Sequence, residues 1–156
     1  MVYHLNGSHG AFGLLEVALR DLRYSEADFE AIAAQVRQRS VFTTHSPVSA
    51  ASNVFAADLI ESFLGSYWPH LGLSREDFLA LGNRRPDDPW DLFSMTVLAL
   101  RLSGKANGVS PRHGEICREM WQALYPDREV DQVPIGAITN GVHAATWTAP
   151  LMSDLY

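Results

Sequence analysis

The stretch Val41-Phe42-Thr43-Thr44-His45-Ser46-Pro47 decides the predicted fold. Its β-branched and aromatic residues favour a strand over 41–44, and Pro47 forces the residue before it into an extended conformation, so the strand should end there. His45 is therefore expected at the carboxyl end of a strand. The same arrangement, a short strand that runs into a polar turn, recurs towards both ends of the chain.

Two further strands are predicted. Residues 1–5 (MVYHL) form a β-prone run that ends at the turn-forming residues Asn6, Gly7 and Ser8. Residues 133–138 form a short strand that runs into the turn signal at 139–141, which contains Asn140. Three polar turns thus follow three strands.

Apolar residues recur at helical spacing between these strands. The predicted helices cover residues 11–23, 25–39, 58–68, 74–82, 91–102 and 110–125. Ser25, Ser74 and Ser110 are predicted as their N-caps, and Pro111 fits a first turn. The segment 103–108 carries two glycines and is interpreted as a break after a helix. Strands alternating with helices predict a helix-rich α/β fold with a few short parallel strands.

The polar segment 83–89, which has two prolines, is too short to indicate a domain boundary, so residues 1–156 are expected to form one unit. The formal net charge of −6 and the scattered basic residues argue against a nucleic-acid partner. Cys117 is the sole cysteine, and its apolar context is typical of a reducing compartment. No leader or membrane-spanning run is evident, so a cytoplasmic location is expected, with no membrane partner.

The three turns are the candidate site, because ligands of open α/β sheets bind outside the carboxyl ends of the strands. Asn6 and His9 either hydrogen-bond a neutral polar ligand such as a sugar or tie the turn to its own backbone, and turn asparagines are common. His45 has the same two interpretations. His113 shares a helix face with Cys117, which favours a buried core histidine.

Other kinds of site find no support in the pattern. The six histidines have no HExxH spacing, so no metal site is predicted. The GxxxxGK[ST] order of a phosphate loop is absent, and so are the GxGxxG and GxSxG motifs. Glu115 and Glu119 lie four residues apart on one helix and are interpreted as a solvated acidic edge.

Four blocks of the sequence resemble the glycogen and α-glucan phosphorylases, most closely the shorter bacterial and archaeal type. The blocks, in the order in which that family has them, are residues 3–12 (YHLNGSHGAF), 41–48 (VFTTHSPV), 95–104 (MTVLALRLSG) with 106–110 (ANGVS), and 134–136 (PIG) through 139–143 (TNGVH) to Trp147. The helix residues 113–115 and 118–121 also match. The resemblance implies a Rossmann-like domain of a GT-B glycosyltransferase, of which this chain is an internal part of the N-terminal, glucan-binding side.

That family cleaves the terminal α-1,4-linked glucosyl unit with phosphate and releases glucose 1-phosphate, with retention of configuration. Carried over position by position, the resemblance implies that His45 is catalytic and contacts the glucosyl unit through its side chain and backbone carbonyl. It also implies that Asn140 hydrogen-bonds a sugar hydroxyl, and that Asn6 and His9 line the pocket. The expected ligands are an α-1,4-glucan or maltodextrin and phosphate.

Two departures from the family pattern affect the expected activity. The family has an acidic residue after the asparagine of the first block, where this chain has Gly7. The family also binds pyridoxal phosphate, which acts with its phosphate group as the acid/base partner of the attacking phosphate, through a lysine in its C-terminal half. The sole lysine here, Lys105, lies outside that motif, so the chain is not expected to hold the cofactor.

The resemblance therefore predicts part of a glucan phosphorylase that is inactive in isolation and lacks its C-terminal cofactor domain. The alternative is a non-catalytic carbohydrate-binding or partner-binding remnant of a phosphorylase, which the loss of the acidic residue at Gly7 favours. Phosphorylases of this kind often dimerise, so the full-length form is expected to be a homodimer.

Overall fold

A computed structural model of the chain describes residues 1–46, 53–85, 88 and 90–153. The strands are β1 Tyr3–Asn6, β2 Ser40–Thr43, β3 Val54–Phe55, β4 Phe93–Ser94, β5 Lys105–Gly108 and β6 Ile135–Ala137. The α-helices are α1 Phe12–Leu22, α2 Phe29–Gln38, α3 Ala57–Leu64, α4 Arg75–Ala80, α5 Met95–Leu102, α6 Pro111–Trp121, α7 Ala144–Trp147 and α8 Pro150–Ser153. Short 3₁₀ turns cover Ser8–Gly10, Trp68–Leu71, Gln122–Leu124 and Val130–Gln132.

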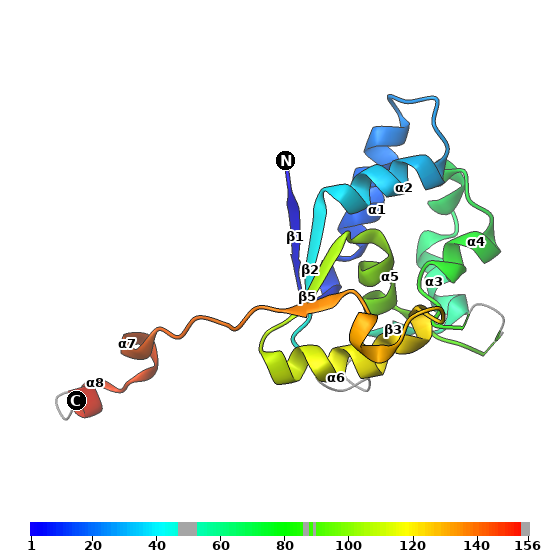
Figure 1. The fold of residues 1–156 in the computed structure, drawn as a ribbon. Coiled ribbons are helices and arrows are strands. Elements are labelled where there is room, and N and C mark those ends of the chain that lie inside the picture. The colour runs from blue at the N-terminus through cyan, green and yellow to red at the C-terminus, as the bar shows by residue number, and fades with distance from the viewer. Residues whose placement is uncertain (47–52, 86–87, 89, 154–156) are drawn as a thin grey trace.

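Four strands form one parallel sheet in the order β1-β2-β5-β6, which is also their order along the chain. Parallel strands need crossover connections, and these are nearly always right-handed, so a sheet that grows in one direction carries its connecting helices on one face. Figure 1 shows α1, α2 and α5 on the same side of the strands. The α/β class with parallel strands, predicted from the sequence, is confirmed.

The two faces of this sheet differ in character, because successive side chains of a strand point to opposite sides. Leu5 and Phe42 are paired across β1 and β2, and Ala106 and Ile135 across β5 and β6, on the face that the helices cover. The next positions along each strand, among them Asn6, Thr43 and Asn107, project from the opposite face. In the part of the chain that the structure describes, no helix packs on that second face (Figure 1).

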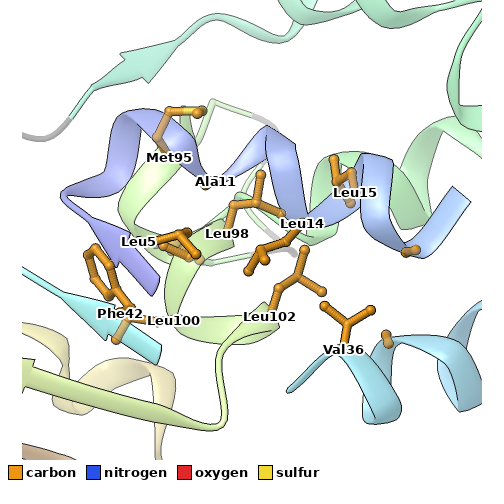
Figure 2. Close-up of a cluster of buried hydrophobic side chains, with 14 of the residues drawn as sticks. Leu5, Ala11, Leu14, Leu15, Val36, Phe42, Met95, Leu98, Leu100 and Leu102 are labelled. Atoms are coloured by element: carbon orange, nitrogen blue, oxygen red, sulfur yellow. The ribbon is translucent and has the colours of Figure 1, made fainter. Parts of the chain in front are cut away.

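A single hydrophobic core lies between the sheet and the helices. Figure 2 shows Leu5 and Phe42 from the strands in one cluster with Leu98, Leu100 and Leu102 of α5 and Leu14 of α1. Leu98 and Leu102 are fully buried. Seven of the eight residues of α5 are buried, so this helix is the centre of the fold, and its continuous apolar stretch explains why it is surrounded by other elements.

Three predicted helix boundaries need correction. Helix α2 begins later than expected, because Asp28 and not Ser25 accepts the hydrogen bond from the backbone N–H at the cap, that of Ala31, at 2.9 Å. Helix α3 ends at Leu64, and its buried residue is Ile60, whereas Phe63 is 78% exposed. The segment expected to be helical from residue 91 begins its helix at Met95. The caps at Ser74 and Ser110 are confirmed.

The segment interpreted as a loop break at 103–108 contains strand β5, which lies between β2 and β6. Its glycines mark close packing rather than a turn. A Cβ on Gly104 would lie 2.3 Å from the carbonyl oxygen of Arg37, and one on Gly108 would lie 2.9 Å from the backbone nitrogen of Gly114. Since Arg37 is distant in the chain and Gly114 belongs to the following helix α6, the local pattern does not reveal these contacts.

The C-terminal segment leaves the sheet after residue 140. The N–H of Ile138 donates to the carbonyl of Gly108 at 2.9 Å, which continues the pairing beside β5. Beyond it, the chain runs away from the sheet to α7 and α8 (Figure 1), and Val142 and Trp147 are exposed. Pro47 and part of the predicted loop at 83–89 lie outside the described residues. None of the helices that the structure describes is long and apolar enough to span a membrane.

Candidate functional site

A polar hollow of about 400 Å³ lies on the uncovered face of the sheet, toward the carboxyl ends of its strands. Every strand of the sheet, or the residues just after it, contributes to the wall. The lining residues are His4, Asn6, Val41, Thr43, His45, Asn107, Ile138 and Asn140. The hollow therefore brings together three of the four predicted site residues, Asn6, His45 and Asn140, from segments that are far apart in the sequence.

His45 and Asn6 are in direct contact across the ends of β2 and β1. The ring nitrogen Nε2 of His45 is hydrogen-bonded to the side-chain oxygen of Asn6. Because that oxygen can only accept, Nε2 is the donor, and the neutral ring keeps Nδ1 as an acceptor. Both side chains are exposed, so they remain accessible from the hollow. The contact fixes the mutual position of two turns that the sequence analysis treated separately.

Asn140 reaches the hollow because the chain continues alongside the residues after β5. Its backbone N–H donates to the carbonyl of Val109 at 3.2 Å. The side chain of Ile138, 66% exposed, lies on the same wall. The turn predicted at 139–141 is therefore wrong: the segment has no turn there and stays paired beside the residues after β5 as far as Asn140, which brings Asn140 to the same hollow as Asn6 and His45.

His9 lies in a second, adjoining hollow of about 580 Å³ along β1 and α1, which shares His4 and Asn6 with the first. The turn that carries His9 depends on Gly7, whose φ of +95° is a conformation that side-chain-bearing residues rarely adopt. A Cβ on Gly7 would lie 3.1 Å from Nδ1 of His9. The His9 ring thus occupies the space beside the position where related phosphorylases are expected to have an acidic residue.

A row of hydrogen bonds crosses three strands on the floor of the hollow. Nε2 of His4 lies 2.8 Å from Oγ1 of Thr43, and that hydroxyl lies 3.1 Å from Oδ1 of Asn107. The amide nitrogen of Asn107 donates in turn to the carbonyl of Gly108 at 3.1 Å. Thr43 and Asn107 are buried, whereas His4 is exposed.

Sequence reasoning did not assign His4, Thr43 and Asn107 to the site. The available signal is alternation, because His4 and Asn6 are two residues apart on one strand and so project from the same face. Asn107 was missed together with strand β5, because the segment 103–108 was interpreted as a break after a helix.

The remaining candidates lie elsewhere. His113 is buried on α6, and its Nδ1 accepts the N–H of Val109 at 3.1 Å, which confirms the interpretation as a core histidine. Lys105 is the first residue of β5, at the opposite end of the strand from the hollow. Glu115 is exposed and pairs with Arg112 at 2.9 Å. Among the residues that the structure describes, no group of three or more His, Cys, Asp or Glu side chains is placed to hold a metal ion.

Burial changes the acidity of one nucleophile. Cys117 lies in the core, and desolvation raises the pKa of its thiol to about 11. A buried thiol with a raised pKa is a poor nucleophile at neutral pH. Cys117 is therefore a structural residue and takes no part in the chemistry of the hollow.

The lining of the hollow defines the class of ligand that it suits. Its polar groups are amides, a hydroxyl and imidazoles, and the described lining includes no carboxylate, ammonium or guanidinium group. Neutral donors and acceptors of this kind match a neutral polyol. The chain is thus an α/β unit with a parallel sheet, and neutral polar side chains line a hollow at the carboxyl ends of its strands.

Comparison with known proteins supplies the family. No protein-family model matches the chain. It is 38% identical over 155 residues to a glycogen phosphorylase of Mycobacterium tuberculosis, 36% identical over 148 residues to a maltodextrin phosphorylase of Thermococcus litoralis, and 34% identical over 154 residues to a glycogen phosphorylase of Aquifex aeolicus. These alignments cover 96%, 94% and 99% of this chain and 18%, 17% and 22% of the respective relatives.

Over nearly all of its length this chain is a homologue of the glycogen and maltodextrin phosphorylases, and it spans about a fifth of the length of the curated relatives it matches. The family resemblance inferred from the four sequence blocks is thereby confirmed.

Proposed function

We propose that this chain forms part of the sugar-binding side of an α-1,4-glucan phosphorylase of GT-B architecture, within its N-terminal domain. The observation that carries the proposal is the convergence of Asn6, His45 and Asn140 on one polar hollow at the carboxyl ends of a parallel sheet. The assignment to a phosphorylase is supported by the names of the homologues and by alignments that cover nearly all of this chain. The proposed substrates are an α-1,4-glucan or maltodextrin and inorganic phosphate.

In the proposed reaction, the bond between the terminal anomeric carbon and the glycosidic oxygen breaks, a proton passes to that oxygen, and phosphate forms the new bond to the same carbon. The products are glucose 1-phosphate and a glucan shorter by one unit. Asn6 and Asn140 would orient sugar hydroxyls, since amides both donate and accept hydrogen bonds. The side chain and carbonyl dipole of His45 would contact the glucosyl unit, where positive charge develops at the ring.

The residues of this chain do not fit the pyridoxal phosphate on which the family relies. A Schiff base needs a lysine, and Lys105, the sole lysine of the sequence, lies at the amino end of β5, away from the hollow. The lining of the hollow also lacks a basic side chain to hold a phosphate dianion. We therefore assign the cofactor and the phosphate to a separate C-terminal part of the assembled enzyme and derive no step through them.

A second candidate function is a non-catalytic carbohydrate-binding or partner-binding remnant. Gly7 favours it, because this position carries no carboxylate and its φ of +95° opposes the introduction of any side chain. A pocket that has lost a charged group can still bind a neutral glucan. The two candidates therefore differ in turnover rather than in binding.

One assay separates them. The chain is incubated with maltodextrin, phosphate and pyridoxal phosphate, with and without the C-terminal half of the Mycobacterium tuberculosis relative, and glucose 1-phosphate is measured. Product formed only when the C-terminal half is present supports the proposed function. Product formed by the isolated chain would contradict the proposal that the chain is only part of the active enzyme. Absence of product in both, with maltodextrin binding retained in titration calorimetry, would favour the remnant.

The role of His45 is tested in a chimera in which residues 1–156 replace the matching stretch of the same relative. His45→Ala is expected to lower kcat by at least about 100-fold, because a contact made at the reacting sugar is lost. Gln35→Ala, an exposed change on α2, serves as the control. Unchanged turnover in the His45 variant would remove this residue from the site.

A further inference from the structure

The hydrogen-bonded row His4–Thr43–Asn107 has no evident structural purpose. Thr43 and Asn107 are buried polar residues in the middle of a small sheet, where an apolar pair of similar shape would avoid the cost of removing a hydroxyl and an amide from water. The sheet does not depend on the row for its backbone pairing, which follows the registers of β1, β2 and β5. The row ends at an exposed imidazole, which is where its effect should be sought.

The direction of each hydrogen bond in the row is determined by the groups themselves. The amide of Asn107 donates through Nδ2 to the carbonyl of Gly108, so its Oδ1 faces Thr43 as an acceptor. The single hydroxyl hydrogen of Thr43 is therefore used on Asn107. As a result, Thr43 must accept from Nε2 of His4, and that ring nitrogen carries the proton.

In the neutral His4 ring, this order of donors leaves the lone pair of Nδ1 without a hydrogen bond to any residue that the structure describes. His4 lines both polar hollows, beside Asn6 in each, so the ring is accessible to whatever binds there. A sugar hydroxyl is a suitable donor to such a nitrogen. The side-chain oxygen of Asn6 likewise accepts a hydrogen bond from Nε2 of His45. In their neutral forms, both histidines of the hollow therefore carry the proton on Nε2.

We infer that His4 is a further glucan-contacting residue of the hollow, that Thr43 and Asn107 are positioning residues that hold its ring with Nε2 protonated, and that Nδ1 accepts a hydrogen bond from a sugar hydroxyl. The inference rests on the proposed function. It extends that function to three residues of β1, β2 and β5 and predicts a hydrogen-bond acceptor, rather than a donor, at this point of the wall.

The test combines calorimetry with NMR on the chain itself. Maltopentaose binding is measured for the wild type, for His4→Phe, and for the double variant Thr43→Val/Asn107→Val. The double variant removes the hydroxyl of Thr43 and the amide of Asn107 together, so neither is left buried without its partner. The carbonyl of Gly108 still accepts a hydrogen bond from the N–H of Ile138. Both variants are expected to raise Kd about five-fold, the effect of one lost hydrogen bond. The free energy of unfolding of the double variant should be unchanged or higher.

Two-bond ¹⁵N–¹H spectra at pH 7.5 report which ring nitrogen of His4 is protonated. The wild type should show Nε2 protonated, and the double variant should move both ring nitrogens toward the averaged shifts of a free imidazole. Thr96→Val, which removes a similarly buried hydroxyl from α5 away from the hollow, should change neither the spectrum nor Kd.

The outcomes separate this inference from the proposed function. If the wild type binds maltopentaose and the His4 and double variants bind it equally well, or if the His4 shifts are unaffected by the double variant, the inference is wrong and the proposed function stands. If the wild type does not bind maltopentaose, the proposed function is wrong and the sugar contact of His4 falls with it.

Discussion

Nε2 of His45 donates a hydrogen bond to the side-chain oxygen of Asn6, and this contact joins the carboxyl ends of the two strands β2 and β1 at the mouth of the polar hollow. Neither residue is buried, so the contact adds little to the stability of the fold. Its effect is to hold an amide and an imidazole side by side in a position where a ligand can reach both.

Replacing Asn6 by alanine should therefore separate binding from stability. We expect Asn6→Ala to raise the maltopentaose Kd by about ten-fold, because a sugar contact and the support of His45 are lost together, and to lower the free energy of unfolding by less than about 1 kcal/mol. Calorimetry and urea unfolding measure the two quantities. A loss of stability comparable to the loss of binding energy would identify Asn6 as a structural turn residue.

The turn at Gly7 offers a test of backbone conformation. Gly7→Ala should destabilise the chain by about 1–2 kcal/mol, because an L-residue at φ +95° is strained and its Cβ would crowd the His9 ring. Gly13→Ala on α1 is the matched control, since a Cβ there meets no atom within 4 Å. In that helical position alanine should stabilise by up to about 1 kcal/mol. Equal effects in urea unfolding would refute the role assigned to Gly7.

The backbone strain at Gly7 also applies to a variant that introduces the acidic residue implied by the family resemblance at this position. Gly7→Glu should reduce stability at least as much as Gly7→Ala, so the carboxylate cannot be returned by this change alone without a cost to the turn. Thermal unfolding of the two variants compares them directly. A Gly7→Glu variant as stable as the wild type would show that the turn adapts readily.

The start of α2 distinguishes two candidate caps. Asp28→Ala should cost about 1 kcal/mol, because the N–H of Ala31 loses its acceptor, whereas Ser25→Ala should cost less, since Ser25 accepts only from the N–H of Ala27 within the preceding turn. Urea unfolding of both variants gives the comparison. The reverse order would restore Ser25 as the cap.

The thiol of Cys117 should resist modification in the folded chain. The side chain is fully buried and its pKa is raised to about 11 by desolvation, so the thiolate is scarce at pH 8 and the thiol is inaccessible. An aromatic disulfide reagent should react at the rate at which the protein unfolds, and at once in guanidinium. Because the folded pKa lies above the unfolded value, the stabilisation from the neutral thiol is present below about pH 8.5 and is lost as the pH rises toward 11. Rapid reaction of the native chain would contradict the burial of Cys117.

Much of the fold follows from local sequence. The apolar spacing of α1 and α6 and the caps at Ser74 and Ser110 are properties of neighbouring residues, and the structure has them where the pattern predicts. Strand β5 was missed because Gly104, just before it, and Gly108, its last residue, allow close contacts with Arg37 of α2 and Gly114 of α6 rather than marking a break.

The sequence by itself determined that His45 follows a strand, that Asn6 lies where a second strand ends, and that Asn140 follows a third. It also determined the α/β class and, through four blocks, the resemblance to the glycogen and α-glucan phosphorylases. Only the tertiary structure decided that these residues share one hollow, that His9 lies in the next, and that His4, Thr43 and Asn107 complete the wall. The reason is that strand order and register are set by long-range pairing and core packing, and these alone bring together residues as far apart in the chain as His4 and Asn140.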